Sequence, residues 1–161
     1  MTEKYRKISN SPEETFNFGV LLGRFIEKGF LLLLLGDLGS GKTLLAKGIA
    51  EGAGYKNEVT SPTFSIIQEY NSGSKNIIHM DLYRLNTEEE LIEIGFEEYL
   101  DKDNIVIIEW PELAFSLLPA DFVFIEIKKL TDNKREIIIF GEGKQKEIIM
   151  ERLNNNADIR N

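Results

Sequence analysis

The 161-residue sequence contains no cysteine, so it can form neither a disulfide framework nor a metal site built on thiolates. Basic residues are also in short supply, because 19 lysines and arginines stand against 27 acids and give a formal net charge of −8. Unaided binding to nucleic acid is therefore not expected, since it needs positive side chains that displace counterions from phosphates. Long apolar runs are missing as well, so we expect neither a membrane span nor a signal peptide and place the protein in the cytoplasm.

A chain of this length can bury one sizeable core, and it contains neither an internal repeat nor a linker. We therefore predict a single domain over residues 1–153, followed by a polar tail over residues 154–161.

The most informative stretch is residues 36–43, Gly-Asp-Leu-Gly-Ser-Gly-Lys-Thr, which fits the pattern Gly-x-x-x-x-Gly-Lys-Ser/Thr of a phosphate-binding loop. The glycines let the backbone curl so that its N–H groups point into one concavity, where they can cradle phosphate oxygens. Lys42 adds a positive charge against the β- and γ-phosphates, and Thr43 offers a hydroxyl to Mg²⁺. The residues predicted to bind a nucleotide here are Asp37, Leu38, Gly39, Ser40, Gly41, Lys42, Thr43 and Leu44.

The segments on either side of this loop support the interpretation. The apolar run over residues 30–35 is typical of a buried parallel strand, and residues 44–52 have the composition of a helix. Strand, glycine loop and helix in this order are the context that a phosphate-binding loop requires. The alternative, a glycine-rich turn in an unrelated fold, is disfavoured by these flanking segments.

Two acidic residues are associated with apolar strands. The all-apolar strand over residues 105–108 is followed by Glu109, which is the general form of a Walker B strand, and a carboxylate there can hold Mg²⁺ or polarise the attacking water. Asp81 lies toward the end of a strand over residues 77–83 and is a candidate ligand of Mg²⁺ or water. For both acids the alternative is a capping residue without a chemical role. His79, the only histidine, is expected to be a packed or partly exposed strand residue rather than a metal ligand.

Local signals predict the remaining elements. Ser-Pro-Glu-Glu at residues 11–14 predicts a helix start with a capping box, and Gly29 predicts the end of that helix. A second capping box at Thr87 predicts a helix through Leu91 and Ile94, with Leu100 as its furthest limit. Polar residues 1–10 are expected at an edge. One hairpin is predicted from strands over residues 65–70 and 76–83, and a second from strands over residues 121–129 and 135–140. A closing helix is predicted over residues 144–153.

Two further stretches each allow two interpretations. Residues 59–64 carry three hydroxyls around Pro62, so they form either an ordinary turn or a loop whose hydroxyls face the nucleotide. Between Glu88 and Asp103, eight acids accompany a single base, Lys102. This acidic stretch is either a solvated helix face or a docking surface for a partner.

With these motifs in order, the chain resembles the TsaE (YjeE) family of small bacterial P-loop ATPases. The phosphate-binding loop alone is generic, but the other motifs in this order and spacing are specific, and the resemblance covers nearly the whole chain. It is carried by residues 36–43, Ser-Pro-Thr-Phe at 61–64, His-Met-Asp-Leu-Tyr-Arg-Leu at 79–85, Glu89, Glu90, Leu91, residues 94–96, Tyr99, and Ile-Glu-Trp-Pro-Glu at 108–112. The last third matches more loosely, chiefly at Arg135 and the turn with Gly141 and Gly143.

The resemblance implies an α/β fold of the P-loop NTPase type, with three layers: a mixed parallel and antiparallel sheet with helices on both faces. It implies that the protein hydrolyses ATP with Mg²⁺ in support of the synthesis of threonylcarbamoyladenosine, a modified base of tRNA that lies beside the anticodon. A complex of TsaD and TsaB homologues would transfer the threonylcarbamoyl group. The protein would contact tRNA through this complex rather than directly. No membrane is involved.

The resemblance also implies roles for individual residues. Thr43 and Glu109 would sit at Mg²⁺, and Asp81 would lie near the metal and the γ-phosphate, so that Asp81 and Glu109 are the candidate catalytic residues. Ser61, Pro62 and Thr63 would form a switch-like loop. Further residues expected at the nucleotide are Trp110, Thr15 and Arg135.

Three other functions share some of these features. A small-molecule P-loop kinase should also carry a lid rich in arginine, but the six arginines are scattered along the chain. A GTPase is suggested only by Asn-Lys-Arg-Glu at residues 133–136, which lacks the final aspartate and does not follow a buried strand. A nucleotide-dependent docking subunit with little hydrolysis differs from a partner-activated ATPase only in its turnover with the partners present.

Overall fold

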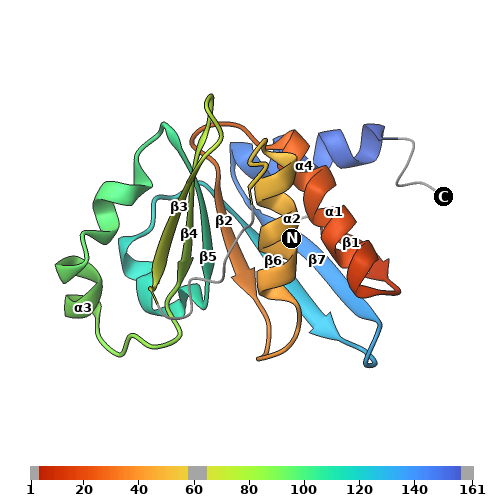
Figure 1. Cartoon of the computed structure of the whole chain (residues 1–161), viewed down its shortest axis with the longest axis horizontal. Coiled ribbons are helices and arrows are strands. Elements are labelled where there is room, and N and C mark those ends of the chain that lie inside the picture. Colours follow the sequence, from red (N-terminus) through yellow and green to blue (C-terminus); the bar gives the residue numbers. More distant parts are fainter. Residues whose placement is uncertain (1–3, 58–64, 157–161) are drawn as a thin grey trace.

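The computed structural model describes residues 4–57 and 65–156 and has a mixed β-sheet as its central layer (Figure 1). In this part of the chain seven strands pair in the order β1-β7-β6-β2-β5-β4-β3. The strands are β1 (Tyr5–Ser9), β2 (Leu31–Leu35), β3 (Ile67–Asn71), β4 (Asn76–Asp81), β5 (Asn104–Glu109), β6 (Phe122–Lys129) and β7 (Arg135–Glu142). Strands β6, β2, β5 and β4 are parallel to one another, whereas β7 pairs antiparallel with β6, β3 with β4, and β1 with β7. Both predicted hairpins and the edge position of the N-terminal segment are therefore confirmed.

Helices cover both faces of this sheet, as expected for the α/β class. The α-helices are α1 (Pro12–Phe25), α2 (Lys42–Gly52), α3 (Glu88–Glu93) and α4 (Lys144–Asn155), and two 3₁₀ segments are η1 (Phe96–Leu100) and η2 (Pro111–Leu117). Successive side chains of β2 point to opposite faces, so Leu32 and Leu34 pack with α1, α2 and α4. Leu31 and Leu33 pack with α3, η1 and η2 on the other face. The first four residues of the leucine run therefore each pack in a core, whereas Leu35 is half-buried.

The capping signals locate the start of α1 correctly. The Ser11 side chain accepts a hydrogen bond from the amide of Glu14 at 3.1 Å, while the Glu14 carboxylate reaches back to the amide of Asn10 at 2.7 Å. The helix ends at Phe25, four residues before the predicted end at Gly29, and the intervening residues form a turn in which Gly29 has φ +89°.

The helix predicted after Thr87 is confirmed, but its extension to Leu100 is wrong. Thr87 caps α3 as expected, but the α-helix stops at Glu93 and the chain continues as the 3₁₀ segment η1. Gly95 lies between them with φ +75°, a left-handed conformation that interrupts helical geometry and that glycine adopts at little cost.

Helices α1 and α2 cross with their backbones in direct contact (Figure 1). Glycines line both sides of this crossing, with Gly19 and Gly23 on α1 facing Gly48 and Gly52 on α2. A Cβ atom on any of the four would lie between 2.0 and 2.5 Å from a backbone oxygen of the other helix. The helix that begins in the phosphate-binding loop is thus held tightly against α1.

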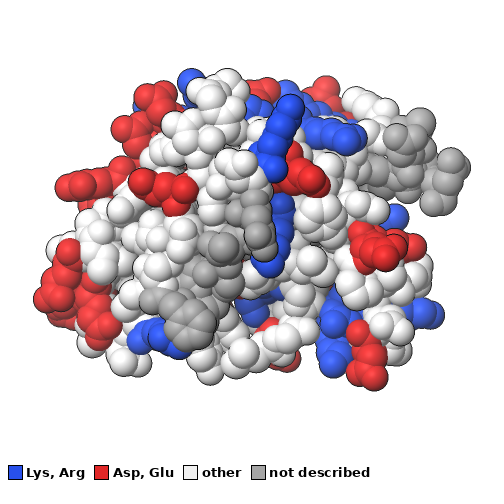
Figure 2. Space-filling view, viewed as in Figure 1, with Lys and Arg blue, Asp and Glu red and all other residues white. Residues whose placement is uncertain are grey.

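Acidic side chains gather at the end of the molecule that carries α3 (Figure 2). The acids of the stretch from Glu88 to Asp103 lie at the surface, and most are exposed. Exposure is what a solvated helix face requires, so a docking surface on these acids stays a prediction. In the described part of the chain, no helix has both the length and the apolar character needed to span a membrane.

Candidate functional site

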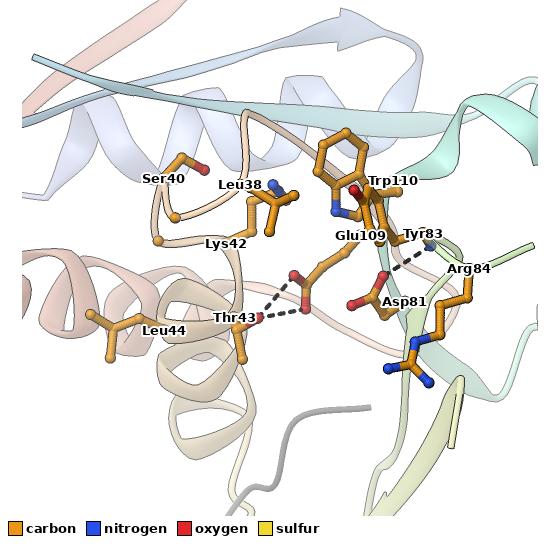
Figure 3. A pocket seen from close by; sticks show the side chains of 12 residues that line it. Leu38, Ser40, Lys42, Thr43, Leu44, Asp81, Tyr83, Arg84, Glu109 and Trp110 are labelled. Carbon is orange, nitrogen blue, oxygen red and sulfur yellow. Dashed lines mark hydrogen bonds between the residues drawn. The ribbon is translucent and has the colours of Figure 1, made fainter. Parts of the chain in front are cut away.

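The site lies where three neighbouring parallel strands end. Strand β2 runs into the phosphate-binding loop, and the next strands in the sheet are β5 and then β4. The register pairs Leu34 with Glu109 and Asp81 with Glu109, so both predicted acids come to the same edge of the sheet as the loop. Figure 3 shows the Glu109 carboxylate pointing toward Thr43, with Asp81 facing the same space from β4.

The phosphate-binding loop has the geometry that its glycines predict. Gly41 has φ +108°, a left-handed conformation that lets the chain enter α2 at Lys42 immediately afterwards. The first amides of α2 and the positive end of its dipole therefore face the site. A cavity of about 390 Å³ opens here, lined by residues 38–44 together with Asp81, Tyr83, Arg84, Glu109 and Trp110.

Lys42 is buried, with 5% of its surface exposed, and its amine is bound to the loop itself. The Nζ atom donates to the carbonyl oxygens of Gly36 and Asp37, the second at 3.0 Å. Burial lowers the pKa of Lys42 below its ordinary value, and the carboxylates of Glu109 and Asp81 counteract this shift. The amine is thus a charge held among weak acceptors, which an incoming phosphate could replace with a stronger partner.

Glu109 is buried at the end of β5 and has two side-chain partners. The Thr43 hydroxyl donates to its carboxylate at 3.0 Å to Oε1 and 3.2 Å to Oε2. The Nε2 atom of His79 lies 2.6 Å from Oε2. The acid of the Walker B strand and the hydroxyl of the phosphate-binding loop are therefore in direct contact, across 66 residues of sequence.

Asp81 ends β4 and is also largely buried, at 7% exposure. One of its oxygens, Oδ1, accepts a hydrogen bond from the amide of Tyr83 at 3.0 Å, which is the capping interaction that the sequence left as an alternative. The same side chain lines the cavity. Asp81 thus caps the end of β4 and also lines the cavity. Its role as a ligand of Mg²⁺ or water stays a prediction.

Trp110 lies over the loop lysine, as Figure 3 shows. Its backbone adopts a left-handed conformation with φ +56°, which is uncommon for a residue other than glycine and turns the chain directly after Glu109. The Nζ atom of Lys42 lies 4.2 Å from the centroid of the Trp110 ring, and the Tyr83 ring lies 4.9 Å from that of Trp110. The predicted proximity of Trp110 to the nucleotide site rests on this geometry and on its place in the cavity wall.

Two predicted nucleotide contacts, Thr15 and Arg135, lie behind the loop and not in the cavity wall. The Arg135 guanidinium donates from Nε to the carbonyl oxygen of Ser40 at 2.7 Å. Thr15 is buried at the start of α1, where its hydroxyl lies 2.7 Å from that of Ser9. Arg135 is therefore bonded to the backbone of the phosphate-binding loop, whereas Thr15 is bonded to β1.

The oxygen atoms at this site suit Mg²⁺. A hydroxyl from Thr43 and carboxylates from Glu109 and Asp81 are the hard ligands that Mg²⁺ prefers. Within residues 4–57 and 65–156, no group of three or more histidines and acids is arranged to hold a metal by itself. Proteins commonly bind Mg²⁺ through one or two carboxylates together with substrate phosphates and water.

The remaining residues are the predicted switch loop and two residues of the cavity wall that were not predicted. The predicted switch loop of Ser61, Pro62 and Thr63 lies outside the described residues. The sequence analysis assigned no site role to Tyr83 or Arg84, both of which line the cavity. Their position directly after Asp81, at the end of a strand, was the signal that could have identified them.

Comparisons with known proteins identify relatives of this chain. The family model described as "Threonylcarbamoyl adenosine biosynthesis protein TsaE" matches residues 9–137. A protein of Bacillus subtilis described as "tRNA threonylcarbamoyladenosine biosynthesis protein TsaE" is 40% identical over 158 residues, covering 98% of both chains. A protein of Treponema pallidum with the same description is 39% identical over 134 residues, covering 83% of this chain and 98% of the relative. The crystal structure of Bacillus subtilis YdiB superposes with a TM-score of 0.80 at 36% identity, covering 96% of each chain.

Proposed function

The chain belongs to the TsaE family and so to the machinery of tRNA threonylcarbamoyladenosine biosynthesis; from this premise we propose that it binds and hydrolyses ATP with Mg²⁺. The observation that carries the proposal is the contact between Thr43 and Glu109, which joins the phosphate-binding loop to the Walker B acid. A loop that only resembled the motif would have no reason to meet a buried carboxylate at this point. We further propose that ATP hydrolysis supports a complex of TsaD and TsaB homologues.

The loop residues bind the triphosphate. Backbone amides of residues 38–44 and the N-terminus of α2 surround the β- and γ-phosphates. The Lys42 amine exchanges the carbonyl oxygens of Gly36 and Asp37 for phosphate oxygens, which are stronger acceptors because they carry charge. This exchange moves the amine relative to the Trp110 ring.

The two strand-end acids, Asp81 and Glu109, act at the γ-phosphate. When bound, Mg²⁺ neutralises the charge that develops on the phosphates during hydrolysis of ATP. Thr43 and Glu109 would hold the metal, and Glu109 and Asp81 would orient the attacking water. These contacts act mainly on the transition state, so they should affect turnover more than ATP affinity.

The charge of the protein supports contact with tRNA through the complex. A net charge of −8 gives the protein as a whole no long-range attraction to the tRNA backbone, so we propose that the basic surface that tRNA needs belongs to the partner proteins. The exposed Leu38 at the tip of the phosphate-binding loop, with 70% of its surface accessible, places an apolar side chain next to the cavity, where a partner could cover it.

The experiment that tests the proposal measures phosphate release by the purified chain alone, then with TsaD and TsaB homologues, and then with tRNA added. We expect ATP binding by the chain alone and faster hydrolysis in the presence of the partners. The Lys42→Ala variant is the control for contaminating ATPases. ATP binding without hydrolysis under all three conditions would show that the protein is a nucleotide-dependent docking subunit. Phosphorylation of a small molecule would instead show that it is a kinase.

A further inference from the structure

His79 is a buried residue of β4 that does not line the cavity but touches a residue that does. Its side chain is 1% exposed, and its Nε2 atom lies 2.6 Å from Oε2 of Glu109. The two strands are paired in parallel with His79 opposite Ile107, so the imidazole reaches across to the carboxylate two residues further along β5. The contact is therefore fixed by the register of two central strands.

The two oxygens of Glu109 have different surroundings. Oε2 lies 2.6 Å from His79 Nε2 and 3.2 Å from the Thr43 hydroxyl, whereas Oε1 lies nearer to that hydroxyl, at 3.0 Å. Without a donor at Oε2, the side chain could rotate and carry Oε1 away from the loop, because a glutamate has three rotatable bonds. A donor on a rigid strand removes this freedom.

From this geometry we propose that His79 is a positioning residue, whose Nε2–H holds one oxygen of Glu109 so that the other faces Thr43 and the nucleotide cavity. The proposal rests on the proposed function, since it assigns a role in ATP hydrolysis. It extends that function by naming the residue that orients the Walker B acid.

The second ring nitrogen supports the direction of this hydrogen bond. The Nδ1 atom of His79 is buried and has no hydrogen-bond partner among the described residues. With the proton on Nε2, the ring donates to the carboxylate and leaves only a lone pair unpaired at Nδ1. With a proton on Nδ1, a buried N–H would stay unpaired, which is the rarer and more costly arrangement. We therefore assign the proton to Nε2.

Three variants at one position separate a positioning role from simple packing. His79→Leu removes the donor and keeps an apolar side chain of similar bulk. His79→Gln places an amide N–H within reach of Oε2, whereas His79→Asn carries the same group on a side chain too short to reach it. Ile77→Val is the matched control, because Ile77 is fully buried on the same face of β4 and packs only in the core.

The first measurement compares turnover at saturating ATP with KM, in the presence of the partner proteins. We expect His79→Leu and His79→Asn to lower kcat at least tenfold while KM changes less than threefold. We expect His79→Gln to stay within threefold of the wild-type kcat and Ile77→Val to match it. Equal turnover in all variants, or equal loss in the Gln and Asn variants, would overturn the proposal. If the Leu variant fails to fold, the Gln and Asn pair decides alone.

The second measurement asks whether His79 acts through Glu109. In the Glu109→Gln background, adding His79→Leu should lower kcat less than twofold, since the oriented carboxylate is already gone. A further tenfold loss would show that His79 acts independently of Glu109 and would refute positioning.

A third readout does not require hydrolysis. Calorimetry gives the ATP affinity with Mg²⁺ and with EDTA, and the ratio of the two should fall at least threefold in His79→Leu and be kept in His79→Gln. If the wild type binds ATP but hydrolyses none, the proposed function fails while this ratio still decides the role of His79. If the wild type hydrolyses ATP and the Leu variant does so equally, with an unchanged ratio, only the role of His79 fails. If the wild type binds no ATP, both fail.

Discussion

Replacing Gly48 by alanine tests how tightly α2 is held against α1. A Cβ at this position would lie 2.3 Å from the carbonyl oxygen of Phe16 and 3.1 Å from the Cα of Gly19. Ordinary contact begins at 3.4 Å, so the helices would have to separate by 3.4 − 2.3 = 1.1 Å to accept one methyl group. The opposing atom belongs to the backbone, so no change of side-chain rotamer can relieve the clash.

Two opposing terms set the magnitude. Alanine is favoured over glycine inside a helix by about 1 kcal/mol, so at an exposed position the substitution would stabilise the protein. Overpacking of a close-packed interior costs about 1–3 kcal/mol, and a clash with backbone lies at the upper end of this range. We therefore expect a net loss of about 1–2 kcal/mol in the free energy of unfolding. For a protein of this size that loss lowers Tm by about 2–8 °C.

Urea denaturation followed by circular dichroism measures this loss. The pair Lys47→Gly and Lys47→Ala is the matched control, since Lys47 lies at mid-helix in α2 and is only half-buried. The Ala variant of this pair should be the more stable one, by about 1 kcal/mol. If Gly48→Ala also raised the free energy of unfolding, the close crossing of α1 and α2 would be wrong.

Four further predictions concern the site. Lys42→Ala should weaken ATP binding at least tenfold, about 1.4 kcal/mol, by calorimetry, and an unchanged affinity would mean that the loop does not bind phosphate. Glu109→Gln should lower kcat far more than ATP affinity in a phosphate-release assay, and wild-type turnover would reduce this acid to a structural cap. The fluorescence of Trp110, the only tryptophan, should change when ATP and Mg²⁺ are added, because Lys42 leaves its position 4.2 Å from the ring; a flat titration with binding confirmed otherwise would contradict this. Arg135→Lys should weaken ATP binding about threefold to tenfold by calorimetry with little change in Tm, since lysine cannot reproduce the guanidinium contacts that hold the loop; unaltered affinity would show that the loop keeps its shape without them.

Local features of this protein could be predicted because their causes lie within a few residues. The glycines, Lys42 and Thr43 define the phosphate-binding loop wherever it occurs, and the apolar strand before Glu109 already indicates an acid at a strand end. The start of α1 at Ser11 followed from one capping residue. In each case the determining atoms are neighbours in sequence.

Contacts between distant segments could not be predicted in the same way. The His79–Glu109 pair spans 30 residues and depends on the register of β4 against β5, which no local pattern specifies. Arg135 meets Ser40 across 95 residues, and its role as a support of the loop follows only from the position of β7. Trp110 lies over Lys42, and its backbone is left-handed there. A tryptophan followed by a proline does not predict this conformation.

The strand order has a consequence for how the protein comes to be folded. Strand β2 is complete at Leu35, yet both its neighbours, β5 and β6, lie beyond residue 103, and β1 has its only pairing partner in β7 among the described strands. A chain made from its N-terminus therefore carries an unpaired run of leucines until most of it has been synthesised, and such runs favour aggregation. Closing these long segments is also slow, because their ordering must precede the contacts that stabilise them. Glu109 and Arg135, which contact the phosphate-binding loop, lie on β5 and β7. Competence to bind a nucleotide should therefore be among the last properties that the newly made chain acquires.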